Sequence, residues 1–475
     1  MPVLPTIEEE DKPTLLRSMW KYRLQFQALS AASFVFIAGG MKLAWSIFES
    51  PSGKFLSNFA THQLTISWFL GVLLGAILAA TFVQRVSKNV AHCISGALLI
   101  FGGINFILVP TYFTAVVSSC ICEGCAYGLT IVQALVTGGE IGERHIRGLL
   151  LSCERIFLWL GICLQLLYTR LWFKFEPPNG YTLHIDQLHG IAIAFLGLFA
   201  ILMTLLHRIE SPLLLQMQHR DLVATQALKR LQGENYPNTD ILRIREDCKQ
   251  LLVYDAGQAG CANFCKKNLL TLFKVVLVRC YATISLSLLF NRAFLSVSWH
   301  GLGCDINCLY LLAIFGLLGS ITGGLIIDQQ GRRKLSVISL LLGAIFIFIV
   351  GGIFEHVEDL QHITQHLVLE LAAYLMFAYQ FITCTGIALA SSVYTAEAFT
   401  LTVKSKCISS VIVCEQLLQL SLAIIAFNIN YKTSIFFFSL GSLGLLLGLL
   451  VFFFMPETKF LMLSECLQKF KSVVY

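Results

Sequence analysis

Charged side chains are scarce in this sequence. Only 13% of its 475 residues are Asp, Glu, Lys or Arg, whereas 56% are hydrophobic. A soluble globular domain carries about 25% charged residues. No water-soluble core of this length needs so many apolar side chains, so the excess must face lipid. The composition therefore excludes a soluble protein and predicts a membrane protein.

Signals of enzymatic chemistry are lacking as well. The chain has no phosphate-binding loop, no nucleophile elbow and no metal-ligand spacing. We therefore expect neither an enzyme nor a bound cofactor, and no nucleic-acid partner. The sequence also lacks any Asn-x-Ser/Thr acceptor, so glycosylation gives no indication of topology.

Cysteines are numerous, with 16 in the chain, mostly inside apolar runs. Cys261 and Cys265 are four residues apart, as are Cys304 and Cys308, but no histidines stand at zinc-binding spacing from either pair. We expect these cysteines to be buried small hydrophobic residues.

Apolar runs of about 20 residues, the length that crosses a bilayer as a helix, are frequent. They predict an all-α membrane protein with twelve transmembrane helices, in which the third and fourth spans are separated by little more than Pro110 and Thr111. The twelve predicted spans are 25–48, 63–83, 92–112, 115–137, 148–170, 188–207, 268–290, 305–327, 335–354, 366–394, 407–428 and 433–455.

Lys and Arg are distributed unevenly between alternate loops. With the N-terminus inside, the inner segments hold 25 of them and the outer loops hold four. Basic residues accumulate on the cytoplasmic side of membrane proteins, so both termini are expected in the cytosol. The predicted organisation is an N-terminal tail (1–24), a six-helix bundle (25–207), a cytoplasmic linker with short amphipathic helices (208–267), a second six-helix bundle (268–455) and a C-terminal tail (456–475).

Polar motifs recur at matching places in the two halves. Glu140 precedes Arg147 by seven residues after the fourth span, and Glu397 precedes Lys404 by seven after the tenth. The second and eighth spans are followed by 84–89 and by the Asp328-x-x-Gly-Arg-Arg loop, and the sixth and twelfth by Glu-Ser-Pro and Pro-Glu-Thr. These matches indicate a six-plus-six repeat. Two such repeats around a site near the membrane midplane are typical of transporters.

These motifs, taken together and in order, resemble the sugar porter family of the major facilitator superfamily, which includes facilitative glucose and trehalose carriers. The resemblance implies the major facilitator fold and transport by rocking of the two halves. Acidic helix ends that face basic loop residues form charge-assisted pairs, which would hold the cytoplasmic ends together in one state. The expected gating residues are Glu140, Arg147, Asp328, Arg332, Arg333, Glu397 and Lys404.

The substrate cavity of the family is rewritten in this chain. The usual arginine of the fourth span is Cys120, and the Asn-Trp of the eleventh span aligns with Glu415-Gln416. By the same resemblance, Lys42 stands where proton-coupled members have a first-span aspartate. We expect Lys42 to pair with Glu123, with Glu154 as a competing partner, and therefore expect a uniporter.

Ionisable residues inside the predicted spans are costly and should face a cavity or one another. They are Lys42, Glu123, Glu154, Arg155, Lys274, Arg279 and Glu415; Lys274 and Arg279 could instead extend to a membrane interface. The residues expected to bind substrate are Lys42, Glu123, Arg155, Gln165, Ser285, Glu415, Gln416 and Gln419.

Three functions remain open from the sequence. The first is a facilitative carrier for a sugar, either a hexose or a disaccharide. The second is a carrier for a charged organic solute, with Arg155 and Glu415 as counter-charges. The third is a transport-inactive nutrient sensor on the same scaffold. The expected partners are a small-molecule substrate and the lipid bilayer, and the expected location is the plasma membrane, with an intracellular membrane as the alternative. The oligomeric state is left open.

Overall fold

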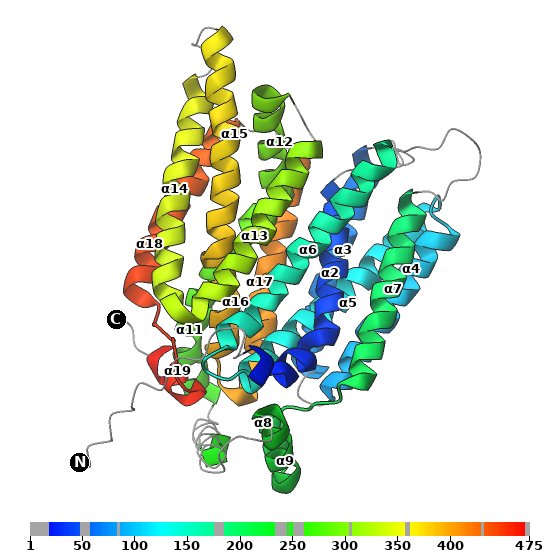
Figure 1. Cartoon of the computed structure of the whole chain (residues 1–475), viewed down its shortest axis with the longest axis vertical. Coiled ribbons are helices and arrows are strands. Elements are labelled where there is room, and N and C mark those ends of the chain that lie inside the picture. The colour runs from blue at the N-terminus through cyan, green and yellow to red at the C-terminus, as the bar shows by residue number, and fades with distance from the viewer. Residues whose placement is uncertain are drawn as a thin grey trace.

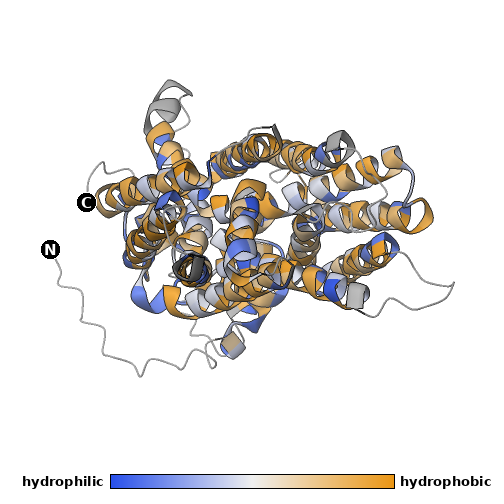
Figure 2. Ribbon diagram, turned by 90° about the horizontal axis from the view of Figure 1, so that it is seen from above, coloured by the Kyte–Doolittle hydropathy of each residue, from blue (hydrophilic) through white to orange (hydrophobic). Residues whose placement is uncertain are grey.

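Two bundles of long helices stand side by side in a computed structural model of the chain (Figure 1). The structure describes residues 19–47, 58–82, 86–174, 185–232, 245–246, 248–249, 261–303, 306–356, 362–428 and 432–470. Within these residues, twelve segments are long and apolar enough to cross a membrane. The predicted number of spans is therefore confirmed. Seen from above, hydrophobic residues predominate on the helices that form the outer surface of the bundles (Figure 2).

Among the described residues, the N-terminal half contains six long helices. They are α2 (Arg23–Ile47), α3 (Asn58–Phe82), α4 (Lys88–Leu108), α5 (Phe113–Ile141), α6 (Arg147–Lys174) and α7 (Ile185–Leu206). Helices α3 and α5 approach closely because glycines line their contact. A Cβ atom on Gly71, Gly75, Gly124 or Gly128 would lie only 2.2–2.4 Å from a carbonyl oxygen of the facing helix. Small residues four apart allow this close backbone approach in membrane helices.

The linker begins with two short helices, α8 (Pro212–Met217) and α9 (Asp221–Gln232), which lie beneath one end of the bundles (Figure 1). Leu228 and Leu231, predicted to share one face of a helix, are buried, whereas Leu222 is exposed. The amphipathic pattern therefore places α9 against the protein along part of its length.

In the described part of the C-terminal half, two spans are interrupted. Its elements are α11 (Cys261–Thr283), η1 (Ile284–Leu286), α12 (Leu288–Leu302), α13 (Ile306–Gln330), α14 (Arg332–His356), α15 (His362–Thr385), α16 (Ile387–Glu397), α17 (Leu401–Asn428), α18 (Thr433–Phe454) and the short α19 (Leu463–Phe470). The seventh span runs from Asn268 to Leu302, so the predicted end at residue 290 is wrong. The helix breaks at η1 and restarts after Ser287, whose hydroxyl accepts the Phe290 N–H.

The second interruption separates α15 from α16 at Gly386. The Ile387 N–H, which the break leaves without a helical partner, donates to the Ser339 hydroxyl of α14 at 2.9 Å. A Cβ atom on Gly386 would lie 2.2 Å from that hydroxyl oxygen, so only glycine fits. Broken spans beside an interface between repeats commonly form the solute sites of transporters.

Cys308 departs from the expected behaviour of the cysteines because it is disulfide-bonded. Cys308 is buried, as expected, but it forms a disulfide, whereas Cys304 lies outside the described residues. Cys308 is at the start of α13, the end predicted to face outward.

Candidate functional site

Four charged side chains meet inside the membrane-spanning region, where the two halves face each other. The Arg279 guanidinium on α11 donates to both carboxylate oxygens of Glu154 on α6, at 3.1 Å from Nη1 and 2.5 Å from Nη2. Its Nε donates to Glu415 on α17 at 2.7 Å. One guanidinium of the C-terminal half therefore holds a carboxylate from each half.

Arg155 completes what we call the ionic quartet, namely Glu154, Arg155, Arg279 and Glu415. The Arg155 Nε lies 3.6 Å from Glu154 Oε1 and its Nη2 lies 3.5 Å from Glu415 Oε1. Ser392 on α16 also takes part, because its hydroxyl donates to Glu154 at 2.7 Å and accepts from Arg279 at 2.8 Å. None of the four charged residues is more than 4% exposed. Their charges cancel, which is how a buried ionic cluster is tolerated.

The quartet contains two of the predicted substrate-binding residues, Arg155 and Glu415. It also contains Glu154 and Arg279, which the predicted site omitted, and Ser392 lies against it. The structure places Arg279 in the interior rather than at a membrane interface, since it is fully buried. The sequence did carry a signal for Glu154 and Arg279, because ionisable residues within spans normally face a partner or a cavity. Ser392 has no comparable signal.

The predicted ion pair between Lys42 and Glu123 is not formed in the part of the chain that the structure describes. Lys42 Nζ instead lies 3.5 Å from the ring centroid of Trp45 and 4.7 Å from that of Phe106. Glu123 lies beside His189, with 3.8 Å between Oε2 and Nε2. Trp45 is three residues further along the helix that carries Lys42, so the cation–π contact is local and needs no approach of another helix.

Gln165 lies with this second polar cluster of the N-terminal half. Its side-chain oxygen is 2.9 Å from His189 Nδ1, and it also accepts from the Tyr168 hydroxyl. The Trp45 indole N–H donates to Asp186 at 3.1 Å in the same region. Lys42, Glu123 and Gln165 are therefore grouped around His189, not around the quartet.

The other predicted substrate-binding residues lie in the C-terminal half. Ser285 is buried in η1, and Gln419 on α17 donates to the carbonyl of Thr283 at 2.5 Å, just before that break. Gln416 is buried beside Glu415, and its side-chain oxygen has no hydrogen-bond partner among the described residues. Ser285, Gln416 and Gln419 thus belong to the elements that carry Arg279 and Glu415, and their binding role stays a prediction.

Ionic and polar contacts also join the halves at the ends predicted to be cytoplasmic. Arg147 of α6 pairs with Glu397 of α16, with 3.2 Å between Nη1 and Oε1. The Asp328 carboxylate, at the end of α13, accepts the backbone N–H groups of Gly148 at 3.0 Å and Leu149 at 2.8 Å. A carboxylate at a helix N-terminus satisfies unpaired N–H groups and is favoured by the helix dipole.

Arg332 and Arg333 follow the eighth span but make different contacts. Arg332 donates to Asp328 at 2.8 Å and lies 4.0 Å from Glu397, so it supports both contacts between the halves. Arg333 lies over the ring of Phe452, 5.2 Å from its centroid, within the C-terminal half. The two backbone N–H groups of Arg332 and Arg333 donate to the Glu457 carboxylate. The contacts of Arg333 among the described residues therefore all lie within its own half.

Glu140 and Lys404 line one pocket together with Lys88, Glu210 and further residues of both halves. Glu140 accepts a hydrogen bond from Ser211 at 2.6 Å. In the described part of the chain no ion pair joins Glu140 to Lys404, although Lys404 is almost fully buried. In the repeat, Glu140 corresponds to Glu397 and Lys404 corresponds to Arg147. The pocket thus lies between two opposite charges whose counterparts form an ion pair.

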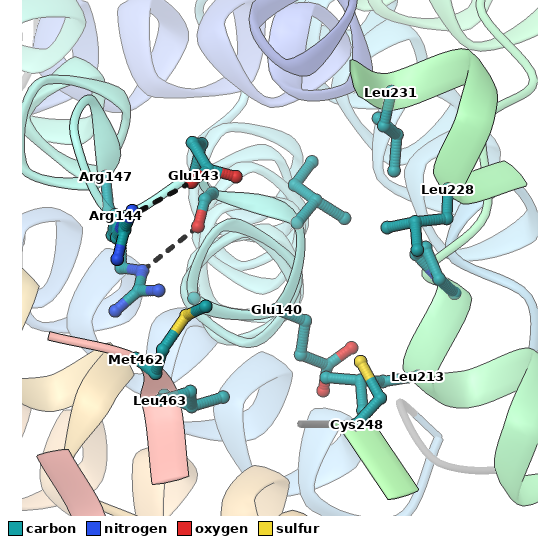
Figure 3. A pocket seen from close by; sticks show the side chains of 14 residues that line it. Glu140, Glu143, Arg144, Arg147, Leu213, Leu228, Leu231, Cys248, Met462 and Leu463 are labelled. Atoms are coloured by element: carbon teal, nitrogen blue, oxygen red, sulfur yellow. Dashed lines mark hydrogen bonds and ion pairs between the residues drawn. The ribbon is translucent and has the colours of Figure 1, made fainter. Parts of the chain in front are cut away.

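A neighbouring pocket shows what covers these contacts (Figure 3). Leu213 from α8 and Leu228 from α9 line one side, and Leu463 from α19 lines another. Arg147 reaches its edge and donates through Nε to the Gly142 carbonyl at 3.1 Å. The linker helices and the C-terminal helix therefore cover the joined ends of the two halves.

A model of a protein family matches most of this chain. Residues 46–470 match the model described as "Sugar (and other) transporter". The chain belongs to this sugar transporter family. The expected membership is confirmed over most of the chain, and the chain is a multi-pass membrane protein of a transporter family.

Curated members of the transporter family are distant relatives. The chain is 23% identical over 203 residues to solute carrier family 2, facilitated glucose transporter member 12, both from Homo sapiens and from Macaca fascicularis. The match covers 42% of this chain and 31% of those proteins, so it spans about a third of their length.

Solved structures show the same fold. The proton:xylose symporter XylE bound to 6-bromo-6-deoxy-D-glucose matches with a TM-score of 0.77 and 18% identity, over 93% of this chain and 98% of that one. The inward-open xylose transporter XylE from E. coli matches with a TM-score of 0.55 and 19% identity, over 95% and 98% of the chains. The predicted fold, twelve transmembrane helices in two six-helix repeats of the major facilitator type, is confirmed.

Proposed function

We propose that this protein carries a small polar solute, a sugar of hexose or disaccharide size, across the membrane by alternating access and facilitated diffusion. One observation carries the proposal: the two halves are joined by polar contacts at the ends predicted to be cytoplasmic. Arg147 pairs with Glu397, and Asp328 caps the start of α6. Such contacts can separate and re-form as the halves rock, so they suit a gate.

The energies are of the right size for a gate. An exposed ion pair contributes only about 0–1 kcal/mol, whereas loss of one partner of a buried pair costs roughly 3–5 kcal/mol. Glu397 is fully buried and Arg147 nearly so. Several such contacts would bias a two-state equilibrium by a few kcal/mol, which solute and water can still overcome.

The division of labour follows from the same idea. Residues 25–207 and 268–455 would be the two rocking halves, and 208–267 a cytoplasmic linker whose helices cover the gate. The tails, 1–24 and 456–475, would lie in the cytosol, and the protein would reside in the plasma membrane. In this scheme Glu140, Arg147, Asp328, Arg332, Glu397 and Lys404 form the gate, and Arg333 only supports it.

Uniport is the proposed mode of transport. Lys42 stands where proton-coupled members of the family have a carboxylate, and a charged lysine cannot load and release protons in the same way. Lys42 Nζ lies 3.5 Å from the ring centroid of Trp45, and the face of an aromatic ring attracts a positive charge. Sugar entry would then follow the sugar gradient alone.

Tracer uptake into proteoliposomes tests the carrier function directly. The panel consists of hexoses, disaccharides and organic ions, each with excess unlabelled solute as the control for specificity. Saturable uptake of a hexose or disaccharide is the expected result. Unlabelled solute loaded inside the vesicles should accelerate entry of the tracer by counterflow. Saturable uptake of organic ions only would contradict the sugar assignment, and uptake of nothing in the panel would favour a transport-inactive sensor.

A further inference from the structure

A groove lies between α4 and α7, at the edge of the N-terminal half that is remote from the C-terminal half (Figure 1). Its volume is about 450 Å³, within the range of roughly 300–1,000 Å³ that is usual for ligand sites. Val90, Ile94 and Leu205 line it and are between 41% and 50% exposed. Because both helices are membrane spans, these apolar side chains face lipid.

The packing of α4 against α7 determines where the groove lies. The two backbones meet at Gly96 and Gly197, since a Cβ atom on Gly96 would lie 2.8 Å from the Gly197 carbonyl oxygen. The groove follows α4 from Ala97, beside this contact, back to Asn89 at the helix start. At 1.5 Å per residue this is about 12 Å, so the groove runs from the level of the lipid headgroups into the acyl region.

The repeat offers a direct comparison with the other half. The Glu210 carboxylate, after α7, accepts the hydroxyl of Ser87 before α4 at 2.8 Å. In the second half, the Glu457 carboxylate, after α18, accepts the backbone N–H groups of Arg332 and Arg333 at the start of α14. Glu210 and Glu457 therefore occupy equivalent places, and the ends of α4 and α7 correspond to those of α14 and α18.

The second half fills the place that the first half leaves open. Counted from the matched residues, Asn89 corresponds to Arg333, and Leu205 corresponds to Phe452. The Arg333 guanidinium lies over the Phe452 ring, 5.2 Å from its centroid, and donates to the Phe452 carbonyl. Asn89 and Leu205 are smaller, and both line the groove instead of closing it. The first half thus has room for a molecule where the second half has its own side chains.

The polar end of the groove carries a positive charge. Arg208 follows α7 by two residues and is exposed, and it forms no hydrogen bond or ion pair with the residues that the structure describes. A guanidinium presents a planar set of donors that fits phosphate oxygens. The loop charges predict that this end faces the cytosol, and the cytosolic leaflet is the one that holds the anionic lipids. A cation above apolar walls matches a phosphate above an acyl chain.

We propose that this groove binds one anionic phospholipid, with its phosphate on Arg208 and Asn89 and an acyl chain along Val90, Ile94 and Leu205. A headgroup with net negative charge is favoured because a zwitterionic headgroup brings an ammonium group that Arg208 repels. The site does not depend on which solute the protein carries, so its failure would leave the proposed carrier function intact.

Photoactivatable phospholipids test the site on the whole protein. The probes are phosphatidylserine and phosphatidylcholine with a diazirine in one acyl chain, each present as a trace in phosphatidylcholine vesicles that contain the protein. Cross-linked peptides are identified by mass spectrometry, and labelling at 89–97 and 204–208 is expressed relative to the total. The phosphatidylserine probe should label the groove about fivefold more than the phosphatidylcholine probe, the factor that one basic residue near an anionic lipid surface supplies.

The variants separate the headgroup contact from the chain contact. Arg208→Gln should abolish the preference for phosphatidylserine, and Arg208→Lys, which keeps the charge, should retain most of it. Ala97→Phe fills the apolar part and should reduce labelling of the groove by both probes. The matched controls are Lys406→Gln, which removes another exposed cation, and Ile345→Phe, which enlarges an exposed apolar residue of α14; both should behave as the wild type.

Equal labelling of the wild-type groove by the two probes would overturn the proposal, and this test does not depend on whether the variants fold. A preference that persists in Arg208→Gln, or that Lys406→Gln abolishes as well, would also overturn it, because the preference would then arise from the overall charge of the protein. Loss in Arg208→Gln alone, with retention in Arg208→Lys, would establish the site.

Discussion

Arg147 and Glu397 are 250 residues apart in the sequence, and their side chains form an ion pair 3.2 Å long. The repeat places each acidic residue seven positions before a basic residue of its own half, Glu140 before Arg147 and Glu397 before Lys404. The structure exchanges the partners, so that the basic residue of the first half meets the acidic residue of the second. A contact of this kind must break whenever these ends of the two halves separate.

Glu397→Gln should favour the inward-open state. The substitution leaves Arg147 without its counter-charge, and loss of one partner of a buried pair costs roughly 3–5 kcal/mol. Spin labels on the cytoplasmic ends of α6 and α13 should therefore report a larger population of long distances. Lys406→Gln, an exposed charge on α17, is the control and should leave the distances unchanged. A distance distribution for Glu397→Gln that equals the wild type would rule out the gating role of the pair.

Gly148→Ala should hinder closure of the cytoplasmic side without removing any charge. A Cβ atom at Gly148 would lie 2.5 Å from Asp328 Oδ1, and this oxygen accepts the Gly148 N–H in the closed arrangement. Separation of the halves relieves the clash, so the variant should populate the inward-open state and take up solute several-fold more slowly. Gly352→Ala is the matched control, because nothing lies within 4 Å of its added Cβ. Equal uptake by the two variants would show that the Asp328 contact does not limit transport.

Single cysteines at Lys54 and Gln232 should lie on opposite sides of the membrane. The distribution of basic residues places the loop containing Lys54, which is outside the described residues, on the outer face, and places the linker in the cytosol. A membrane-impermeant thiol reagent added to intact cells should label the cysteine at position 54. It should label the one at position 232 only after permeabilisation. Labelling of both from the same side would refute the topology.

Sugar entry should not acidify the vesicle lumen in proportion to uptake. At zero membrane potential, a pH-sensitive dye inside proteoliposomes should show no change beyond that of empty liposomes. Stoichiometric acidification would demonstrate proton coupling. The Glu123→Gln variant would then test whether the carboxylate beside His189 carries the proton. Loss of acidification in this variant would identify Glu123 as the proton carrier. The double variant Lys42→Glu with Glu123→Lys should be no more active than Lys42→Glu alone, since the two residues do not pair.

Hydropathy predicted the number of spans, and the matched motifs after the spans predicted the division into halves, because both signals can be read from short stretches of sequence. The ends of the interrupted seventh span were less predictable. The Ile-Ser-Leu segment at 284–286 is apolar enough to continue a membrane-spanning helix, so the sequence does not show the break. The structure shows it, because Ser287 caps the helix that follows. The disulfide of Cys308 also depends on proximity and compartment, which spacing alone did not reveal.

The sequence by itself determined that this chain crosses a membrane twelve times, that its halves are repeats, and that acidic and basic residues gather at the loop ends. Only the tertiary structure decided which charges meet. Arg279 joins Glu154 across the halves, Arg147 joins Glu397, and Lys42 turns to Trp45 instead of Glu123. The reason is physical. The length of an apolar run and the charge of a loop act through their contact with the bilayer, which does not depend on other parts of the chain. An ion pair acts over only a few ångströms, and the order of the helices in the chain does not specify which of them come into contact.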